Sequence, residues 1–383
     1  MKLFFQNKST LKLHERQKCV GNYFSRNFGT KNGKLNLDIA EECQMFRYGY
    51  PKWKTDPAVV FDYLNTANQQ VYSIDKTLEA TGKKLENLDS FLDFAAGFGR
   101  LTRFLIQRLP PEKVWVSDIQ PSAMKFQSKT FGVHTCLSAL EPNDFQPGRK
   151  FEFIFVASLF SHLPRNRFDQ WLKRLWELLT PDGVLAFSVL DRGTALMRLP
   201  YNEEGFTYHP EVSEIEMLPG SEYGSTIVTE RFVAESLARA TDGKAQFQLI
   251  PRGMWHQDLY IVRAGDPMPN PNWGIMDSYF PLVIARQHVF GTLYGTFNRE
   301  MIRSIELLIR DEVMCTVKEN TWQDDATAFH CGERFLAPGW GPSLAFSIKL
   351  PRPMTYEDDL VLRATGQHGS VRVLPVSMGD SFQ

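Results

Sequence analysis

The 383-residue sequence predicts an α/β domain with a doubly wound parallel sheet, followed by an all-β domain. Between residues 88 and 263, short apolar runs alternate with segments whose apolar residues recur every three or four positions. These are the patterns of strands and amphipathic helices. Three prolines within Asp266 to Pro271 then form a stiff linker. Beyond the linker, about seven short strand-like runs separated by Gly, Pro, Asn and Asp predict a β-sandwich.

The composition excludes several functional classes. A net charge of −1 argues against nucleic-acid binding as the main function, because phosphate contacts require clustered Lys and Arg. The five cysteines are an odd number without a C-x-x-C motif, so they indicate neither a zinc site nor a disulfide scaffold. No apolar run approaches the ~20 residues of a membrane helix, and the N-terminus lacks the apolar region of a signal peptide. We therefore expect a soluble cytoplasmic protein without nucleic-acid or membrane partners.

The stretch from Leu92 to Arg100 reads as a strand, a glycine turn and the start of a helix. An apolar run ends at Phe94, Gly97 and Gly99 follow, and apolar residues at helical spacing resume at Leu101. Glycine permits a sharp reversal and lets a ligand approach the backbone, while a helix N-terminus offers unpaired N–H groups. The pattern predicts a nucleotide-like ligand at this turn.

The details of the turn separate the candidate ligands. The third glycine of the dinucleotide pattern G-x-G-x-x-G is missing, and no Gly-Lys-Ser/Thr follows. The run instead resembles the first motif, D-x-G-x-G-x-G, of class I S-adenosylmethionine-dependent methyltransferases, with alanine in place of the first glycine. This resemblance implies that the amino-acid end of S-adenosylmethionine is surrounded by Asp93, Phe94, Ala95, Gly97 and Gly99.

Two further strand ends agree with the resemblance. A second apolar strand, Val114 to Ser117, ends at Asp118, where the family has an acid that binds the ribose hydroxyls. Taken alone, Asp118 would be better explained as a turn or cap residue before Pro121. The resemblance also places the neighbouring Ile119 in the cofactor site, and it places Ser138 and Ala139 beside the adenine ring, after a third predicted strand.

The fourth predicted strand, Phe151 to Ala157, runs into Ser-Leu-Phe-Ser-His-Leu-Pro. This resembles the S-x-F-x-H-L-P segment of many bacterial small-molecule and sugar methyltransferases, and it implies that Ser158 belongs to the cofactor site. His162 becomes the first candidate for a general base, although it is equally suited to capping the next helix. His209 and His256 are weaker candidates, each with a structural role as the simpler interpretation.

The resemblance covers residues 88 to 263 and implies a Rossmann-like sheet of seven strands whose last two strands pair antiparallel. We expect an N-terminal extension at 1–55 and a methyltransferase domain at 56–265, with a substrate-covering insertion at about 191–229. Residues 270–383 resemble, in pattern only, the immunoglobulin-like accessory modules found beside bacterial sugar-modifying enzymes. We also expect fragments 1–265 and 270–383 to fold separately, because the linker between them is rich in proline.

The resemblance implies methyl transfer from S-adenosylmethionine to a small-molecule or sugar acceptor, with oxygen as the expected acceptor atom. The sulfonium already activates the methyl group, so the protein mainly has to hold the acceptor in line with it. No metal is predicted, because Ser158 stands where metal-assisted catechol methylation would need a carboxylate. The motif of enzymes that methylate DNA-base amino groups is absent from Ala157 to Phe160. The alternative is a non-catalytic protein that binds the cofactor, or a glycan or protein, with the β-sandwich carrying the function.

Overall fold

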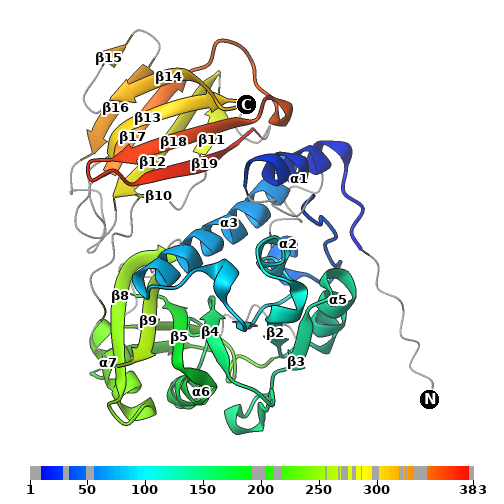
Figure 1. Ribbon diagram of the computed structural model, residues 1–383, viewed down its shortest axis with the longest axis vertical. Helices are drawn as coiled ribbons and strands as arrows, with labels where there is room; N and C mark the ends of the chain where they lie inside the picture. Colours follow the sequence, from blue (N-terminus) through cyan, green and yellow to red (C-terminus); the bar gives the residue numbers. More distant parts are fainter. Residues whose placement is uncertain are drawn as a thin grey trace.

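The computed structural model consists of a larger α/β lobe and a β-rich C-terminal lobe (Figure 1). In the part of the chain that is described, no helix is long and apolar enough to cross a membrane. The described residues are 10–28, 34–48, 56–191, 203–210, 218–254, 257–265, 268, 275–277, 282–285, 287–295, 302–318, 322–323, 326–331 and 343–378.

The α/β lobe is built on a seven-stranded sheet with the order β3-β2-β1-β4-β5-β9-β8. The first five strands of this order run parallel, whereas β9 is antiparallel to β5 and β8 is antiparallel to β9. This confirms the predicted Rossmann-like sheet with an antiparallel final pair. The strands are β1 (Phe91–Phe94), β2 (Val114–Asp118), β3 (His134–Leu137), β4 (Phe151–Val156), β5 (Leu179–Val189), β8 (Ala245–Met254) and β9 (Gln257–Ala264).

Helices cover both faces of this sheet. The longest begins with a typical N-cap, because Asp56 accepts a hydrogen bond of 2.8 Å from the Ala58 N–H and proline occupies the first helical position. The helices are α1 (Glu15–Asn27), α2 (Gln44–Arg47), α3 (Pro57–Ala80), α4 (Thr102–Leu105), α5 (Pro121–Phe131), α6 (Arg165–Glu177) and α7 (Glu230–Ala240).

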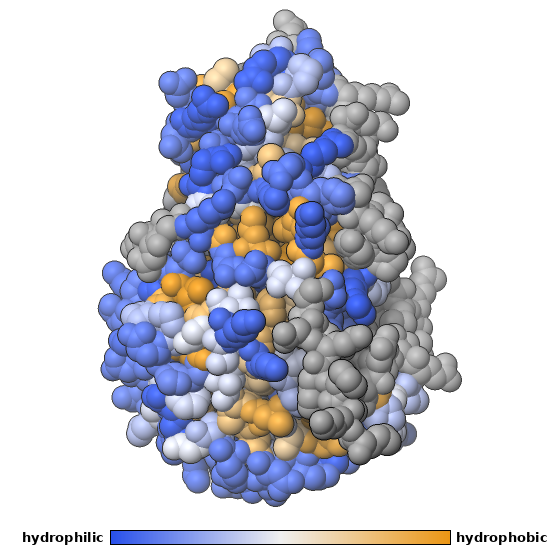
Figure 2. Space-filling view, turned by 90° about the vertical axis from the view of Figure 1, so that its right-hand side faces the viewer, coloured by the Kyte–Doolittle hydropathy of each residue, from blue (hydrophilic) through white to orange (hydrophobic). Residues whose placement is uncertain are grey.

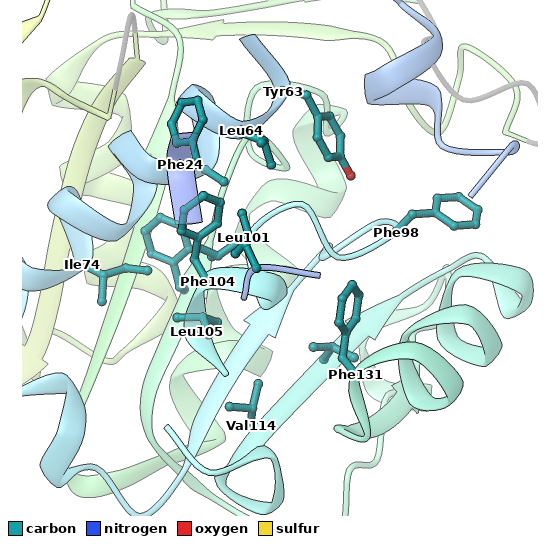
Figure 3. Close-up of a cluster of buried hydrophobic side chains, with 14 of the residues drawn as sticks. Phe24, Tyr63, Leu64, Ile74, Phe98, Leu101, Phe104, Leu105, Val114 and Phe131 are labelled. Atoms are coloured by element: carbon teal, nitrogen blue, oxygen red, sulfur yellow. The ribbon is translucent and has the colours of Figure 1, made fainter. Parts of the chain in front are cut away.

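Each face of the sheet has its own apolar core. One core joins the sheet to α1, α3, α5 and the segment after the glycine turn, and the other joins it to α6 and α7. Figure 3 shows the first core, in which Phe24 of α1 and Leu64 of α3 lie beside Leu101 and Phe104. The segment after the glycine turn therefore packs against α1 and α3.

Several local expectations differ from the structure. Regular α-helix after the glycine turn is limited to α4, with hydrogen-bonded turns on either side. The sequence Thr-Pro-Asp-Gly at 180–183, although typical of a turn, is part of β5 and lies at a shift in the register against β4. The extension at 1–55 contains α1 and α2. α5 begins at Pro121, shortly after Asp118, and was not predicted. Its apolar stripe is weak, and its stability comes from tertiary contacts.

The described part of the insertion forms a small antiparallel ribbon of β6 (Phe206–His209) and β7 (Ser225–Val228). Val228 and Leu190, the residue after β5, are joined by a backbone hydrogen bond of 2.9 Å. The insertion is thus attached to the carboxyl end of the central sheet.

The C-terminal lobe is all-β, as expected. Its described strands form one sheet of the order β14-β13-β18-β19-β11-β12-β17-β16-β15, with β10 paired to β12. The sheet curls, because β14 and β16 also contact each other, and it encloses a separate apolar core. The strands are β10 (Ile275–Asp277), β11 (Leu282–Ala285), β12 (His288–Gly295), β13 (Ile302–Ile309), β14 (Glu312–Lys318), β15 (Trp322–Gln323), β16 (Ala326–Cys331), β17 (Ser343–Lys349), β18 (Leu360–Gly366) and β19 (Val371–Ser377).

The two lobes share a packed junction. The fully buried hydroxyl of Tyr23, on α1, donates a hydrogen bond of 2.7 Å to the Leu360 carbonyl and accepts one of 3.0 Å from the Val376 N–H. Arg26 donates to the Asp359 carboxylate at 2.8 and 2.9 Å. Figure 2 shows hydrophobic residues on the surface where the two lobes meet. The β-lobe residues that join the core of the α/β lobe are Leu308, Tyr356 and Val361.

Candidate active site

A cleft lies at the carboxyl ends of β1, β2 and β4, where ligands bind in open α/β folds. Nine of the ten residues predicted for the cofactor line it, together with His162, the first candidate base. Gly99 is not among the lining residues. The nine are Asp93, Phe94, Ala95, Gly97, Asp118, Ile119, Ser138, Ala139 and Ser158. Their roles as cofactor ligands remain predictions.

The glycine turn adopts left-handed backbone angles at three alternate positions, with φ of 63° at Ala95, 54° at Gly97 and 78° at Gly99. An alanine in this region costs about 1–2 kcal/mol, so the first position stores some strain. A Cβ at Gly97 would meet nothing within 4 Å, because that side of the turn faces open space. A Cβ at Gly99 would instead collide with the Phe131 ring. Gly97 thus keeps room for a ligand, and Gly99 lets α5 pack closely.

Neighbouring side chains hold the turn in place. Gln127 of α5 donates a hydrogen bond of 2.8 Å to the Gly97 carbonyl and accepts one of 2.6 Å from the Thr102 hydroxyl. The fully buried Arg103 donates to the Gly99 carbonyl at 3.1 Å, and also to the carbonyls of Asn36 and Asp38 in the N-terminal extension. These hydrogen bonds attach the N-terminal extension to the segment that follows the glycine turn.

Asp118 ends β2 and points back at the glycine turn. One carboxylate oxygen accepts the Gly97 N–H at 2.8 Å, and the other accepts the Gln120 N–H at 3.0 Å. Burial raises the pKa of Asp118, while these hydrogen bonds oppose the rise. Each oxygen has further lone pairs, so the carboxylate has the acceptor capacity to bind a pair of hydroxyls.

Asp93 is 3% exposed, and its Oδ2 has no hydrogen-bond partner among the described residues. Burial raises its pKa to about 8; the nearby Asp118 carboxylate adds to the rise and Arg100 opposes it. A buried, unpartnered carboxyl oxygen is costly. Because Asp93 lines the cleft, a cationic ligand group bound there would remove that cost.

Ser158, the second residue after β4, is held by residues of two other strands. Ser158 has a φ of 61°, and its N–H donates to the Ser188 hydroxyl oxygen at 2.9 Å. The hydroxyls of Ser158 and Ser188 both donate to the Gln257 side-chain oxygen, at 3.2 and 2.5 Å. Gln257 of β9 is therefore a supporting residue that the sequence did not reveal, since its partners lie 69 and 99 positions away.

The three candidate bases have different positions. His162 lines the cleft, with Nδ1 2.6 Å from the Gly224 carbonyl oxygen and its ring stacked on Tyr223. His209 lies on β6 and does not line the cleft; its buried Nε2 has no partner among the described residues. His256 lies outside the described residues.

Further lining residues come from segments distant in the sequence. The N-terminal extension and α3 contribute one wall, and the insertion and α6 contribute another. No local motif distinguishes these residues, so sequence reasoning missed most of them. They include Cys43, Gln44, Met45, Gln70, Arg167, Leu218, Glu222 and Tyr223. Among the described residues, no group of three or more His, Cys, Asp or Glu has a metal-binding arrangement.

Comparison with known proteins places these features in context. Residues 92–185 match a family model described as a methyltransferase domain. A malonyl-[acyl-carrier protein] O-methyltransferase of Acetivibrio thermocellus is 25% identical over 151 residues, which cover 38% of this chain and 50% of that protein. The chain thus matches about half the length of this curated relative.

Two solved structures are also similar in part. A S-adenosylmethionine-dependent methyltransferase from Clostridium acetobutylicum has 16% identity and a TM-score of 0.39, and the match covers 58% of this chain and 98% of that one. The glycopeptide N-methyltransferase MtfA complexed with S-adenosyl-L-methionine has 14% identity and a TM-score of 0.34, with 46% and 82% covered. The strand order of the α/β lobe and the family match at 92–185 together identify a Rossmann-like methyltransferase domain, a type of domain whose cofactor is S-adenosylmethionine.

Proposed function

We propose that this protein transfers the methyl group of S-adenosylmethionine to a small-molecule or sugar acceptor, with oxygen as the acceptor atom. The observation that carries the proposal is the unpartnered oxygen of Asp93, buried near the Asp118 carboxylate in the cleft that Gly97 also lines. Two carboxyl groups in this setting suit a ligand that has both a cationic amino group and a ribose diol. S-adenosylmethionine has both groups.

Each part of the cofactor has candidate partners in the cleft. Asp118 would accept the ribose hydroxyls and Asp93 the amino group, while Ser138 and Ala139 would lie beside the adenine. Arg100 lines the same cleft and lowers the pKa of Asp93 through its charge. We infer that Arg100 binds the cofactor carboxylate, because a guanidinium is well suited to that group.

The bound cofactor would supply an already activated methyl group, so the chain's task is to orient the acceptor and manage its proton. His162 lines the cleft and carries a hydrogen on Nδ1, which leaves Nε2 to accept the proton of an acceptor hydroxyl. The acceptor would lie between the N-terminal wall and the insertion, where Met45, Leu218 and Tyr223 offer mainly apolar contacts. An acceptor with an apolar or aromatic face and a hydroxyl suits these walls.

The partial relative supports transfer to oxygen, since its name describes an O-methyltransferase. For the C-terminal lobe we propose the role of an immunoglobulin-like accessory module. Its curled sheet and its own apolar core support a role separate from the chemistry. The competing function, a recognition protein without turnover, assigns the biological activity to this lobe.

Methyl-labelled S-adenosylmethionine, incubated with the full chain and a panel of sugars, nucleotide sugars and small phenols, tests the proposal. We expect labelled product from at least one phenol or sugar. The variant His162→Gln should bind the cofactor with unchanged affinity but lose most of the transfer. Cofactor binding without product from any member of the panel would favour the recognition protein, and absence of cofactor binding would refute methyl transfer from S-adenosylmethionine.

A further inference from the structure

The end of the insertion is joined directly to the segment that follows β4. The Gly224 N–H donates to the His162 carbonyl at 2.9 Å, and the Thr226 N–H donates to the Ser161 carbonyl at 2.7 Å. The buried Thr226 hydroxyl donates to the Leu163 carbonyl at 2.5 Å. Three consecutive carbonyls around His162 thus accept hydrogen bonds from the insertion.

The same stretch of the insertion contacts the imidazole ring. The His162 Nδ1 lies 2.6 Å from the carbonyl oxygen of Gly224. A carbonyl only accepts, so Nδ1 must carry the hydrogen, and the lone pair of the neutral ring is on Nε2. The Tyr223 ring stacks on the imidazole with centroids 4.5 Å apart and planes 10° from parallel. Both rings line the cleft.

The Gly224 carbonyl has little freedom to move away. A Cβ at Gly224 would collide with the His209 carbonyl and would lie 2.9 Å from the end of the Tyr208 ring. On the other side of Tyr223, Glu222 pairs with Arg167 of α6 at 3.4 Å. The residues on both sides of Tyr223 are therefore held against the rest of the domain.

We propose that Tyr223 and Gly224 are positioning residues that fix His162 in its Nδ1–H tautomer, which makes Nε2 the nitrogen that can act as the base. The insertion then does more than cover the acceptor, because it determines which ring nitrogen takes the proton. This inference rests on the proposed function for the use of the base, whereas the tautomer itself is independent of turnover.

Long-range ¹H–¹⁵N spectra of the full chain, labelled with ¹⁵N-histidine, report the tautomer directly. The signals of His162 are assigned from their loss in His162→Gln. We expect the Nδ1–H form to dominate in the wild type at a pH where the ring is neutral. Tyr223→Ala should shift His162 toward the Nε2–H form that free histidine favours, and Tyr223→Phe, which keeps the stack, should retain the wild-type form. Tyr48→Ala removes a 79% exposed ring outside the cleft and should change nothing.

Once an acceptor is identified, Tyr223→Ala should lower kcat tenfold or more, and Tyr223→Phe should restore most of it. A wild-type ring in the Nε2–H form would overturn the inference, as would a Tyr223→Ala variant that retains both the wild-type tautomer and kcat. If the tautomer follows the expected pattern but no acceptor is methylated, the proposed function fails and the structural assignment of Tyr223 and Gly224 stands. These outcomes separate the two proposals.

Discussion

Replacement of Asp93 by asparagine should raise the free energy of unfolding of the free protein at neutral pH and should weaken cofactor binding. Burial, together with the Asp118 carboxylate, raises the pKa of Asp93 to about 8 from an ordinary value of 3.8. Between these values the folded protein holds a proton that the unfolded chain has released, so the free energy of unfolding falls as the pH rises. Asp93→Asn removes this titration.

The pKa of Asp93 rises from 3.8 to about 8. At 1.36 kcal/mol per pH unit, this rise sets an upper bound of about 6 kcal/mol on the difference in free energy of unfolding between Asp93→Asn and the wild type. Because the cleft admits solvent, we expect about half of this, roughly 3 kcal/mol. This difference in free energy of unfolding should be small near pH 4, grow through neutral pH and level off above pH 8.

Denaturant unfolding of the wild type and of Asp93→Asn at half-unit intervals from pH 4 to 9 measures this difference. Asp182→Asn, at an exposed position in β5, is the matched control and should follow the wild type. Calorimetric titration between pH 6 and 7.5 should show S-adenosylmethionine binding the wild type more tightly as the pH rises. In Asp93→Asn, binding should be weaker and independent of pH. A stability difference that is constant from pH 5 to 9 would refute the raised pKa and the role built on it.

Four further predictions concern the turn and the junction. Asp118→Ala should weaken S-adenosylmethionine binding by about 1.5–3 kcal/mol, because it removes hydrogen bonds to a charged group, and it should also lower the melting temperature, because the Gly97 and Gln120 N–H groups lose their acceptor; calorimetric affinity within twofold of wild type would place the ribose elsewhere. Gly97→Val should abolish binding, because a branched side chain would fill the open side of the turn; normal binding would make the turn a purely structural reversal. Tyr23→Phe should lower the free energy of unfolding by about 1–3 kcal/mol, since it leaves two buried backbone groups of the β-lobe unpaired. The packed junction argues against the separate folding expected from the proline-rich linker, so fragment 1–265, which would expose the apolar junction, should be less soluble than the full chain; a soluble fragment with near-intact cofactor affinity would instead show that the two lobes are autonomous.

The sequence by itself determined the fold class and the location of the cofactor cleft. Strand periodicity and the glycine spacing are local properties, and parallel strands necessarily bring their carboxyl ends to one edge of the sheet. Asp93, Gly97, Asp118 and Ser158 could therefore be placed at one cleft without any knowledge of long-range contacts. Their arrangement around the cleft follows that prediction, with Gly99 set apart because it packs against α5.

Only the tertiary structure decided which distant segments complete the cleft and how the two lobes meet. Gln257 supports Ser158 from 99 positions away, and Tyr223 reaches His162 from a long insertion without a motif. α1 has a weak apolar pattern of its own, yet it buries Tyr23 between β18 and β19. Such contacts depend on which side chains the folded chain brings together, because packing and buried hydrogen bonds leave no periodic signal in the sequence.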